Sequence, residues 1–325
     1  MTVLVTGGDG FIGTFLVEQL LARGQRVRCL VLEGNRLGRL REWPVEICYG
    51  DICRPESLMD PVKGVEYVYH LAGVKTAWDE ATYFRVNFEG TKNLLEASLK
   101  ESRGIRRFIY ISSQAAAGPS PDGHPITEDE TCHPLTSYGR SKRVVEEHLQ
   151  ARSHEVPITI LRPALVYGPC NIETELFSEI IKWGLILTIR HHDQYLNLIH
   201  VRDVVEAIIL AAEHERARGQ VYFITSQERY TWREIFEQSC RLHDKKGLMI
   251  PIPWAAVKLT AAMVKSYRRM RGQPFSLIDD KMKELLQKHW VCSGEKAKRD
   301  LGYEPKMSLR EGIEETMHRY NEITR

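Results

Sequence analysis

Apolar and polar positions along the first half of the chain alternate between strand-like and helix-like patterns. Short apolar runs rich in β-branched residues predict strands at 2–6, 26–32, 46–49, 65–71, 107–112 and 158–161. Apolar residues at helical spacing predict helices at 11–23, 84–100 and 138–152. This alternation predicts an α/β fold built on a doubly wound parallel sheet, with helices on both faces.

The pattern loosens in the second half, which predicts a smaller lobe. Helical character appears near the end of 169–184, at 204–213 and within 247–275, and 221–225 reads as a late strand. We expect residues 166–325 to interleave with residues 1–165, returning to them in places and covering the carboxyl edge of the sheet, where ligands bind. The apolar helix at 254–270 ends in a basic stretch and predicts packing or a substrate lid, with contact to a membrane surface as the alternative.

The composition narrows the class of protein. Apolar residues make up 43% of the chain, charged residues 27%, and the net charge is +2, which gives no electrostatic case for nucleic acid. The seven cysteines are scattered without a Cys-x-x-Cys pair, which favours reduced thiols and no metal site. No apolar stretch reaches the roughly 18 residues that a membrane span needs, and the N-terminus runs directly into a strand. We therefore expect a cytoplasmic protein.

A glycine-rich turn follows the first predicted strand. Gly7 allows a sharp turn, Gly10 leaves room for a pyrophosphate near the backbone, and Gly13 lets the next helix pack against the sheet. The helix N-terminus then offers N–H groups and a positive dipole end to phosphates. Residues 1–165 are therefore predicted to be a Rossmann-type NAD(P)-binding domain.

The choice between NAD and NADP depends on the end of the second strand. Glu33 lies about 20 residues after Gly13, where an acid binds the ribose hydroxyls of NAD. Arg36, Arg39 and Arg41 follow and could instead reach the extra phosphate of NADP. A solvated charged loop is the alternative for all four residues, and the balance favours NAD.

A proton-transfer group is predicted at the start of the helix at 138–152. Tyr138 and Lys142 lie four residues apart on one helix face. A free tyrosine has a pKa near 10, and a neighbouring ammonium favours its phenolate. Ser113 ends a strand at the carboxyl edge and can donate to the reacting oxygen. The three residues suit acid/base catalysis at a carbinol or carbonyl carbon.

These motifs resemble the extended short-chain dehydrogenases/reductases, the NAD-dependent epimerase/dehydratase group. Further matching segments lie at 50–52, 70–75, 87–91, 161–163, 200–203 and 301–305. The resemblance implies that Tyr138 is the acid/base, that Lys142 holds the ribose and tunes the tyrosine, and that Ser113 binds the substrate oxygen. It also implies a homodimer that packs the helices at 88–100 and 138–152 into a four-helix bundle.

The resemblance further implies a set of residues along the cofactor. Phe11 and Ile12 would line the pyrophosphate, Asp51 and Ile52 the adenine, Leu71, Ala72, Gly73 and Lys75 the nicotinamide half, and Pro163 to Val166 the carboxamide, with Asn87 supporting the site.

Three departures from the family pattern concern the substrate. Gln114 and Ala115 stand where sugar-nucleotide dehydratases carry Asp-Glu. Leu165 falls where many nucleotide-sugar epimerases have asparagine, and 195–199 lacks their pyrophosphate-binding arginine, for which Arg190 or Arg202 could substitute. The C-terminal half resembles the 3β-hydroxysteroid dehydrogenase and dihydroflavonol reductase branch, although the NADP-type arginine of many such reductases is replaced by Leu32.

Three functions follow from these residues. The leading hypothesis is an NAD(P)-dependent dehydrogenase or ketone reductase for a small hydrophobic or cyclic substrate. The second is a sugar or nucleotide-sugar epimerase, in which the same Ser, Tyr and Lys act with no net redox change. The third is a cofactor-binding regulator, against which the presence of both Tyr138 and Lys142 counts.

Overall fold

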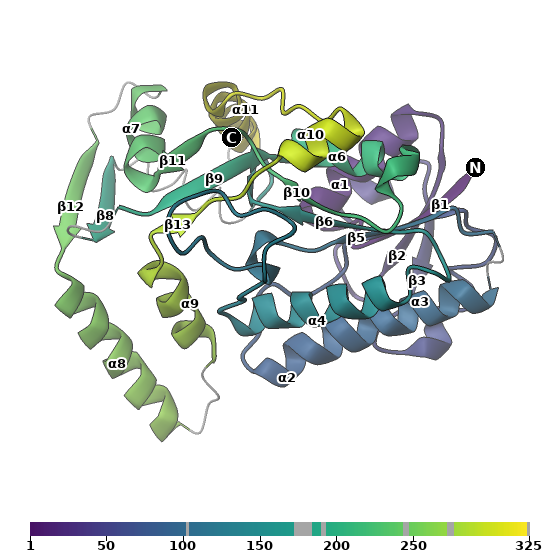
Figure 1. The fold of residues 1–325 in the computed structure, drawn as a ribbon, viewed down its shortest axis with the longest axis horizontal. Helices are drawn as coiled ribbons and strands as arrows, with labels where there is room; N and C mark the ends of the chain where they lie inside the picture. The colour runs from purple at the N-terminus through teal and green to yellow at the C-terminus, as the bar shows by residue number, and fades with distance from the viewer. Residues whose placement is uncertain (102–103, 172–183, 190–192, 243–246, 272–275, 324–325) are drawn as a thin grey trace.

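The computed structural model describes residues 1–101, 104–171, 184–189, 193–242, 247–271 and 276–323. Within them, a seven-stranded parallel sheet has the order β10-β6-β5-β4-β1-β2-β3 (Figure 1). Its strands are β1 (Thr2–Thr6), β2 (Arg26–Val31), β3 (Glu46–Tyr49), β4 (Tyr67–His70), β5 (Arg107–Ile111), β6 (Ile158–Pro163) and β10 (Val221–Ile224). The strand order reverses between β1 and β4, which confirms the predicted doubly wound, Rossmann-type α/β sheet.

Alternate residues of each strand supply two hydrophobic cores. Val3 and Val5 of β1 join the core beneath one helix layer, and Leu4 joins the core beneath the other. Successive side chains of a strand point to opposite faces of the sheet. Because helices cover both faces, the strands are apolar along most of their length. One layer holds α1 (Phe11–Ala22) and α6 (Val201–Glu213), and the other holds α3 (Gly90–Glu101) and α4 (Ser137–Ala151) (Figure 1).

The helix predicted at 84–100 is longer and less regular than its sequence pattern indicates. It begins with α2 (Glu80–Tyr83), passes through a π-helical turn at Phe84–Glu89, and continues as α3. Such π-turns insert a residue into the helix and occur often at functional sites. Here the turn carries Asn87, whose contacts are described below.

The second half builds a smaller lobe and also returns to the sheet. β10 pairs with β6, and α6 covers the sheet beside α1. In the lobe, β9 (Tyr195–His200) pairs with β7 (Leu165–Tyr167), β11 (Arg229–Thr231) and β13 (His289–Trp290), and β8 (Leu185–Ile189) pairs with β12 (Leu248–Ile252). The predicted strand at 221–225 is therefore present, whereas the apolar run that forms β9 was not predicted as a strand. The predicted helical end of 169–184 lies mostly outside the described residues.

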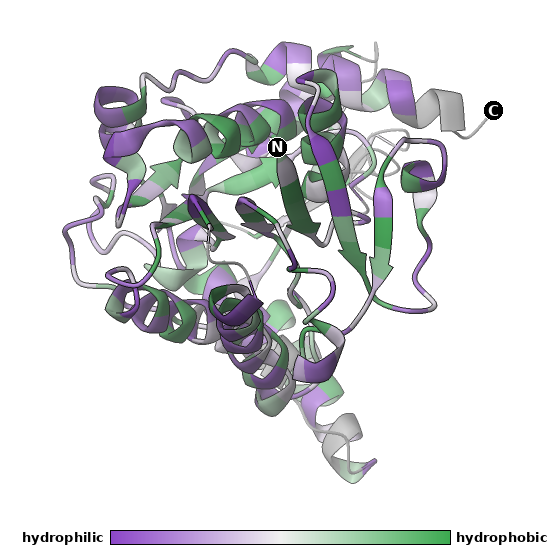
Figure 2. Ribbon diagram, turned by 90° about the vertical axis from the view of Figure 1, so that its right-hand side faces the viewer, coloured by the Kyte–Doolittle hydropathy of each residue, from purple (hydrophilic) through white to green (hydrophobic). Residues whose placement is uncertain are grey.

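The lobe also contains the helices α7 (Trp232–Leu242), α8 (Trp254–Met270), α9 (Ser276–Leu286) and α11 (Leu309–Ile323). The helix α10 (Glu295–Leu301) instead packs against β10 of the central sheet. α8 extends away from the body of the molecule (Figure 1). Coloured by hydropathy, the strands of the central sheet are mainly hydrophobic, whereas the surrounding helices also carry hydrophilic residues (Figure 2). Within the described part of the chain, no helix combines the length and apolarity that crossing a membrane requires.

Candidate active site at the carboxyl edge of the sheet

The residues predicted to act on cofactor and substrate gather at one edge of the sheet. The glycine turn follows β1, Glu33 follows β2, Asp51 and Ile52 follow β3, the segment 71–75 follows β4, Ser113 follows β5, and Pro163 ends β6. Tyr138 and Lys142 lie in the first turns of α4, Asn87 in the π-helical turn, and Val166 in β7. The carboxyl ends of parallel strands form the crevice in which ligands bind.

The glycine turn has no room for side chains. Gly7 has a φ of +70°, and a Cβ there would lie 2.8 Å from the backbone nitrogen of Ala72. A Cβ on Gly13 would lie 2.0 Å from the carbonyl oxygen of Gly7, and one on Gly10 would lie 3.2 Å from it. Gly10 also gives α1 no side-chain cap, so the helix N-terminus can receive an anion. These features fit the pyrophosphate of a dinucleotide.

A chain of buried hydrogen bonds joins the ends of β1 and β4. The N–H of Ala72 donates to Thr6 Oγ1, which lies 2.7 Å from His70 Nδ1, and His70 Nε2 lies 2.8 Å from Thr91 Oγ1. Thr91 donates onward to the carbonyl of Asn87. Burial, reinforced by the charge of Lys142, lowers the pKa of His70 to about 3, so its ring is neutral. The partners assign the proton to Nε2, with Thr6 donating to Nδ1.

Asn87 fastens the loop after β4 to α4. Its side-chain amide accepts from the N–H of Val74 and donates to the carbonyl of the same residue, at 2.8 and 3.0 Å. It also donates to Ser141 Oγ at 2.9 Å. A Cβ on Gly73 would lie 2.8 Å from Asn87 Oδ1, so the loop approaches as closely as it can. Asn87 thus holds the predicted nicotinamide loop beside the helix that carries Tyr138.

Tyr138 and Lys142 lie together, as their spacing predicts. Lys142 is 5% exposed, and its ammonium donates to the carbonyl of Ile111 at 2.8 Å and lies 6.0 Å from the centre of the Tyr138 ring. Burial lowers the pKa of Lys142 to about 7, and the carboxylate of Glu146 opposes that shift. A lysine with such a pKa exchanges protons readily near neutral pH.

The two serines after β5 have different surroundings. Ser112 is buried and donates to Glu146 Oε1 at 2.6 Å. The same carboxylate accepts two hydrogen bonds from Arg162, at 2.9 and 2.6 Å, and both charged side chains are almost completely buried. Ser113 is only half-buried, and its Oγ accepts from the N–H of Ala115. Ser113 is therefore the serine whose hydroxyl is available to a substrate.

The adenine end of the predicted cofactor site is more open. Glu33 is exposed in a turn after β2. Asp51 Oδ1 accepts from the N–H of Cys53, and Ile52 is buried against Gly90. The arginines predicted as alternatives for a phosphate differ from one another. Arg39 pairs with Glu18 at 2.9 Å and stacks on Trp43, whereas Arg36 is exposed.

Several residues that shape the site were not predicted from the sequence. They are His70, Thr6 and Thr91 in the buried hydrogen-bond chain, Glu146 and Arg162 beneath Ser112, and Asp280, whose carboxylate accepts from the N–H of Ser137 at the start of α4. The four-residue spacing of Lys142 and Glu146, and an arginine inside an apolar strand, were available signals for part of this set. No sequence pattern connects Asp280 with Ser137.

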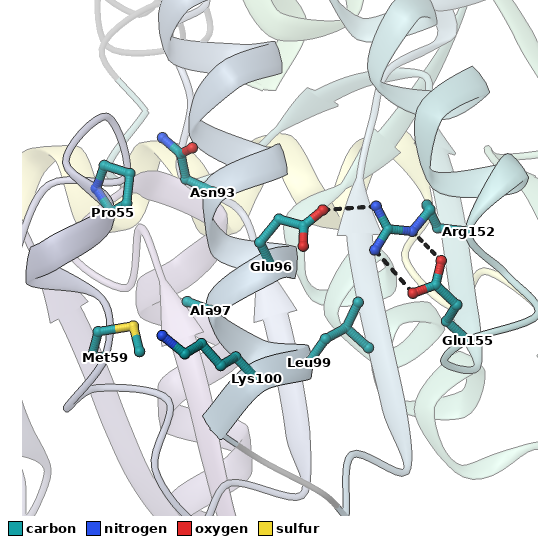
Figure 3. Close-up of a pocket in the computed structure, with 9 residues that line it drawn as sticks. All are labelled: Pro55, Met59, Asn93, Glu96, Ala97, Leu99, Lys100, Arg152 and Glu155. Atoms are coloured by element: carbon teal, nitrogen blue, oxygen red, sulfur yellow. Dashed lines mark hydrogen bonds and ion pairs between the residues drawn. The ribbon is translucent and has the colours of Figure 1, made fainter.

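A surface cavity of about 540 Å³ lies elsewhere, near the ends of α3 and α4 (Figure 3). Arg152 stands there between Glu96 and Glu155 and bonds to both. Helices that connect parallel strands run opposite to them, so their C-terminal ends lie near the amino edge of the sheet. This cavity is therefore separate from the predicted cofactor site. Among the described residues, no cluster of His, Cys, Asp and Glu is arranged to hold a metal.

Comparisons with known proteins identify the family and the fold of this chain. A sequence profile of the NAD dependent epimerase/dehydratase family matches residues 3–225. The chain is 29% identical to the ceramide reductase of Caulobacter vibrioides, over 98% of this chain and 94% of that one. It is 32% identical to sterol demethylase protein B of Methylococcus capsulatus, over 70% of each. The UDP-glucose 4-epimerase of Thermus thermophilus, solved with NAD, is 25% identical and superposes with a TM-score of 0.78 over 99% of both chains.

Proposed function

Because this chain belongs to the NAD dependent epimerase/dehydratase family and is therefore an NAD(P)-dependent enzyme, we propose that it is a dehydrogenase or reductase for a hydrophobic or cyclic substrate. Residues 1–165 would bind the cofactor, with NAD preferred, and residues 166–325 would mainly bind the substrate. The observation that carries the proposal is the pair of Tyr138 and buried Lys142 at the same sheet edge as a glycine turn that has no room for side chains.

Two polar side chains that could bind a nucleotide sugar are already bonded to other parts of the protein, which favours an apolar substrate. Asn197 in β9 bonds to the carbonyl of Glu228 and to the N–H of Cys292, so its amide is already used inside the lobe. Arg202 makes a bidentate pair with Glu315 and lies over the ring of Phe15, which removes it as a pyrophosphate ligand. Arg190 lies outside the described residues. Two relatives, named as a ceramide reductase and a sterol demethylase protein, support a lipid-like substrate.

In the proposed mechanism, the residues of this chain manage the oxygen of the substrate. The Tyr138 hydroxyl exchanges the proton of the carbinol, and Ser113 donates a hydrogen bond to the same oxygen. The nearby Lys142 favours the phenolate form of the tyrosine when it is charged. The bound cofactor would donate or accept the hydride through its nicotinamide, and Gly7, Gly10 and Gly13 would hold the pyrophosphate of the same cofactor.

The first test replaces the hydroxyl of Tyr138. We expect Tyr138→Phe to bind NAD as the native enzyme does and to lose turnover by about 100-fold or more, because the acid/base group is gone. Tyr303→Phe is the matched control, since Tyr303 is buried and its hydroxyl has no hydrogen-bond partner among the described residues. Wild-type turnover by Tyr138→Phe would contradict the assignment.

An epimerase remains the second candidate, because the likeness to UDP-glucose 4-epimerase extends over nearly the whole chain. The two functions differ in how the cofactor is held. We expect freshly purified enzyme to release little nucleotide on denaturation, as measured by mass spectrometry, and to bind added NAD reversibly. Near-stoichiometric NAD in that assay would favour the epimerase. The cytoplasmic location and the homodimer through α3 and α4 stay predictions, the latter to be measured by analytical ultracentrifugation.

A further inference from the structure

α8 carries two apolar faces, and only one of them is turned toward the protein. Trp254, Val257, Ala261 and Val264 repeat at helical spacing and are half-buried. Leu259, Met263 and Met270 lie on the opposite side of the helix, where they are 63%, 64% and 80% exposed. Single exposed apolar residues are common, but a row of large ones along one helix indicates an interaction surface.

The charge around this face is one-sided. Residues 247–278 contain no Asp or Glu, yet they hold five cations, Lys258, Lys265, Arg268, Arg269 and Arg271, in a chain whose net charge is only +2. At 100° per residue, Lys258 lies about 100° from Leu259, and its ammonium stands over the ring of Trp254 at 5.8 Å. Arg271 lies nearer the row, over the ring of Tyr267 at 5.3 Å. Cations beside an apolar row on a single helix complement an anionic lipid surface, where the side chains can reach phosphates while the row enters the acyl region.

The hairpin that contains α8 is also tied to the active site. α9 follows α8, and its buried Asp280 accepts from the backbone N–H of Ser137, the residue before Tyr138, at 2.7 Å. The carbonyl of Glu284 in α9 accepts from Gln194 and from Trp290, which fixes the helix to the substrate lobe. α8 is therefore connected through the next helix, α9, to the start of α4, which carries Tyr138 (Figure 1).

We propose that the exposed row Leu259, Met263 and Met270 of α8, with the cations of the same acid-free segment, binds the surface of an anionic lipid bilayer and places the active site beside it. The idea that an apolar substrate enters the active site from the bilayer rests on the proposed function. The idea that α8 binds the bilayer is independent of it. The 17-residue helix lies along the surface rather than across it, with the exposed Tyr267 near its C-terminal end at the level of the headgroups.

The test is flotation of the full-length protein with two kinds of vesicle, one of phosphatidylcholine alone and one with an equal amount of phosphatidylglycerol. We expect binding to the vesicles that contain phosphatidylglycerol, and we expect salt to weaken it. The variant Leu259→Gln/Met263→Gln should bind about thirtyfold more weakly, because two large apolar side chains no longer leave water. The matched control Leu259→Met/Met263→Leu keeps both apolar groups and should bind as the native protein does.

Three results would overturn the inference. They are no binding to phosphatidylglycerol vesicles at low salt, equal binding by the Gln/Gln variant, and self-association that this variant abolishes, which would assign the face to a second copy of the chain. Cofactor binding and turnover of a water-soluble ketone, measured without vesicles, keep the two proposals separate. Turnover without vesicle binding rejects only the surface, whereas vesicle binding without turnover rejects only the dehydrogenase.

Discussion

Glu146 is the residue whose replacement most directly tests the buried charge network beneath the active site. Its carboxylate is fully buried, accepts from Ser112 at 2.6 Å, and accepts twice from Arg162, itself 2% exposed. In Glu146→Gln the amide nitrogen becomes a donor. If the amide nitrogen takes the place of Oε2, it faces Nη2 of Arg162, which is now 2.6 Å from that oxygen. If it takes the place of Oε1, it faces the hydroxyl of Ser112 and Nε of Arg162. In both orientations one donor is turned toward another donor.

The expected loss of stability follows from what the substitution leaves behind. The guanidinium of Arg162 stays buried without the carboxylate that is bonded to it now, and its Nη1 already has no hydrogen-bond partner among the described residues. Removing one partner of such a pair costs about 3–5 kcal/mol. At about 2 °C per kcal/mol for a chain of this length, the midpoint of thermal unfolding should fall by about 6–10 °C.

The control for this measurement is one residue away on the same helix. Glu147 pairs with Arg143 at 2.9 Å, but its side chain is 56% exposed, so Glu147→Gln should shift the midpoint by only about 1 °C. Both variants are compared with the native protein by differential scanning calorimetry without cofactor. Equal shifts for the two variants would refute the reasoning, because Glu146 is buried with three hydrogen bonds from Ser112 and Arg162, whereas Glu147 is exposed.

Two further predictions concern the cofactor cradle and the buried lysine. Gly13→Ala should weaken NAD binding by about tenfold or more in a titration, because its Cβ would lie 2.0 Å from the Gly7 carbonyl, whereas Gly104→Ala, with nothing within 4 Å, should bind normally. Lys142→Met should abolish turnover yet stabilise the cofactor-free protein at pH 7, since burial lowers the pKa of Lys142 to about 7, against about 10.4 in the unfolded chain. Between those values the unfolded state binds more protons, so the native protein gains stability as the pH rises, and the advantage of the variant should vanish near pH 10 in thermal melts. A pH-independent difference would contradict that account.

The sequence alone determined the sheet, its turn chemistry and the local part of the site. Apolar runs and helical repeats are short-range patterns, so the strands of the first half and the helices at 11–23 and 138–152 were predicted to within a few residues of their ends. Gly7, Gly10 and Gly13 lie within one turn, and Tyr138 and Lys142 within one helix face, so their proximity depends on local geometry alone. Membership of the family then identifies the cofactor of this local site as a nicotinamide dinucleotide.

The tertiary structure decided the contacts between segments that are distant in sequence. His70 meets Thr6 and Thr91 because β4 pairs with β1 in the sheet and α3 packs on the face of that sheet, and Asp280 caps α4 across more than 140 residues. The π-helical turn at Asn87 likewise serves contacts with Val74 and Ser141. Which of two adjacent serines is buried, and which face of α8 stays exposed, depends on what the neighbouring elements cover. Burial and pairing across such distances are properties of the packed chain, because local propensity carries no information about which segment will lie opposite.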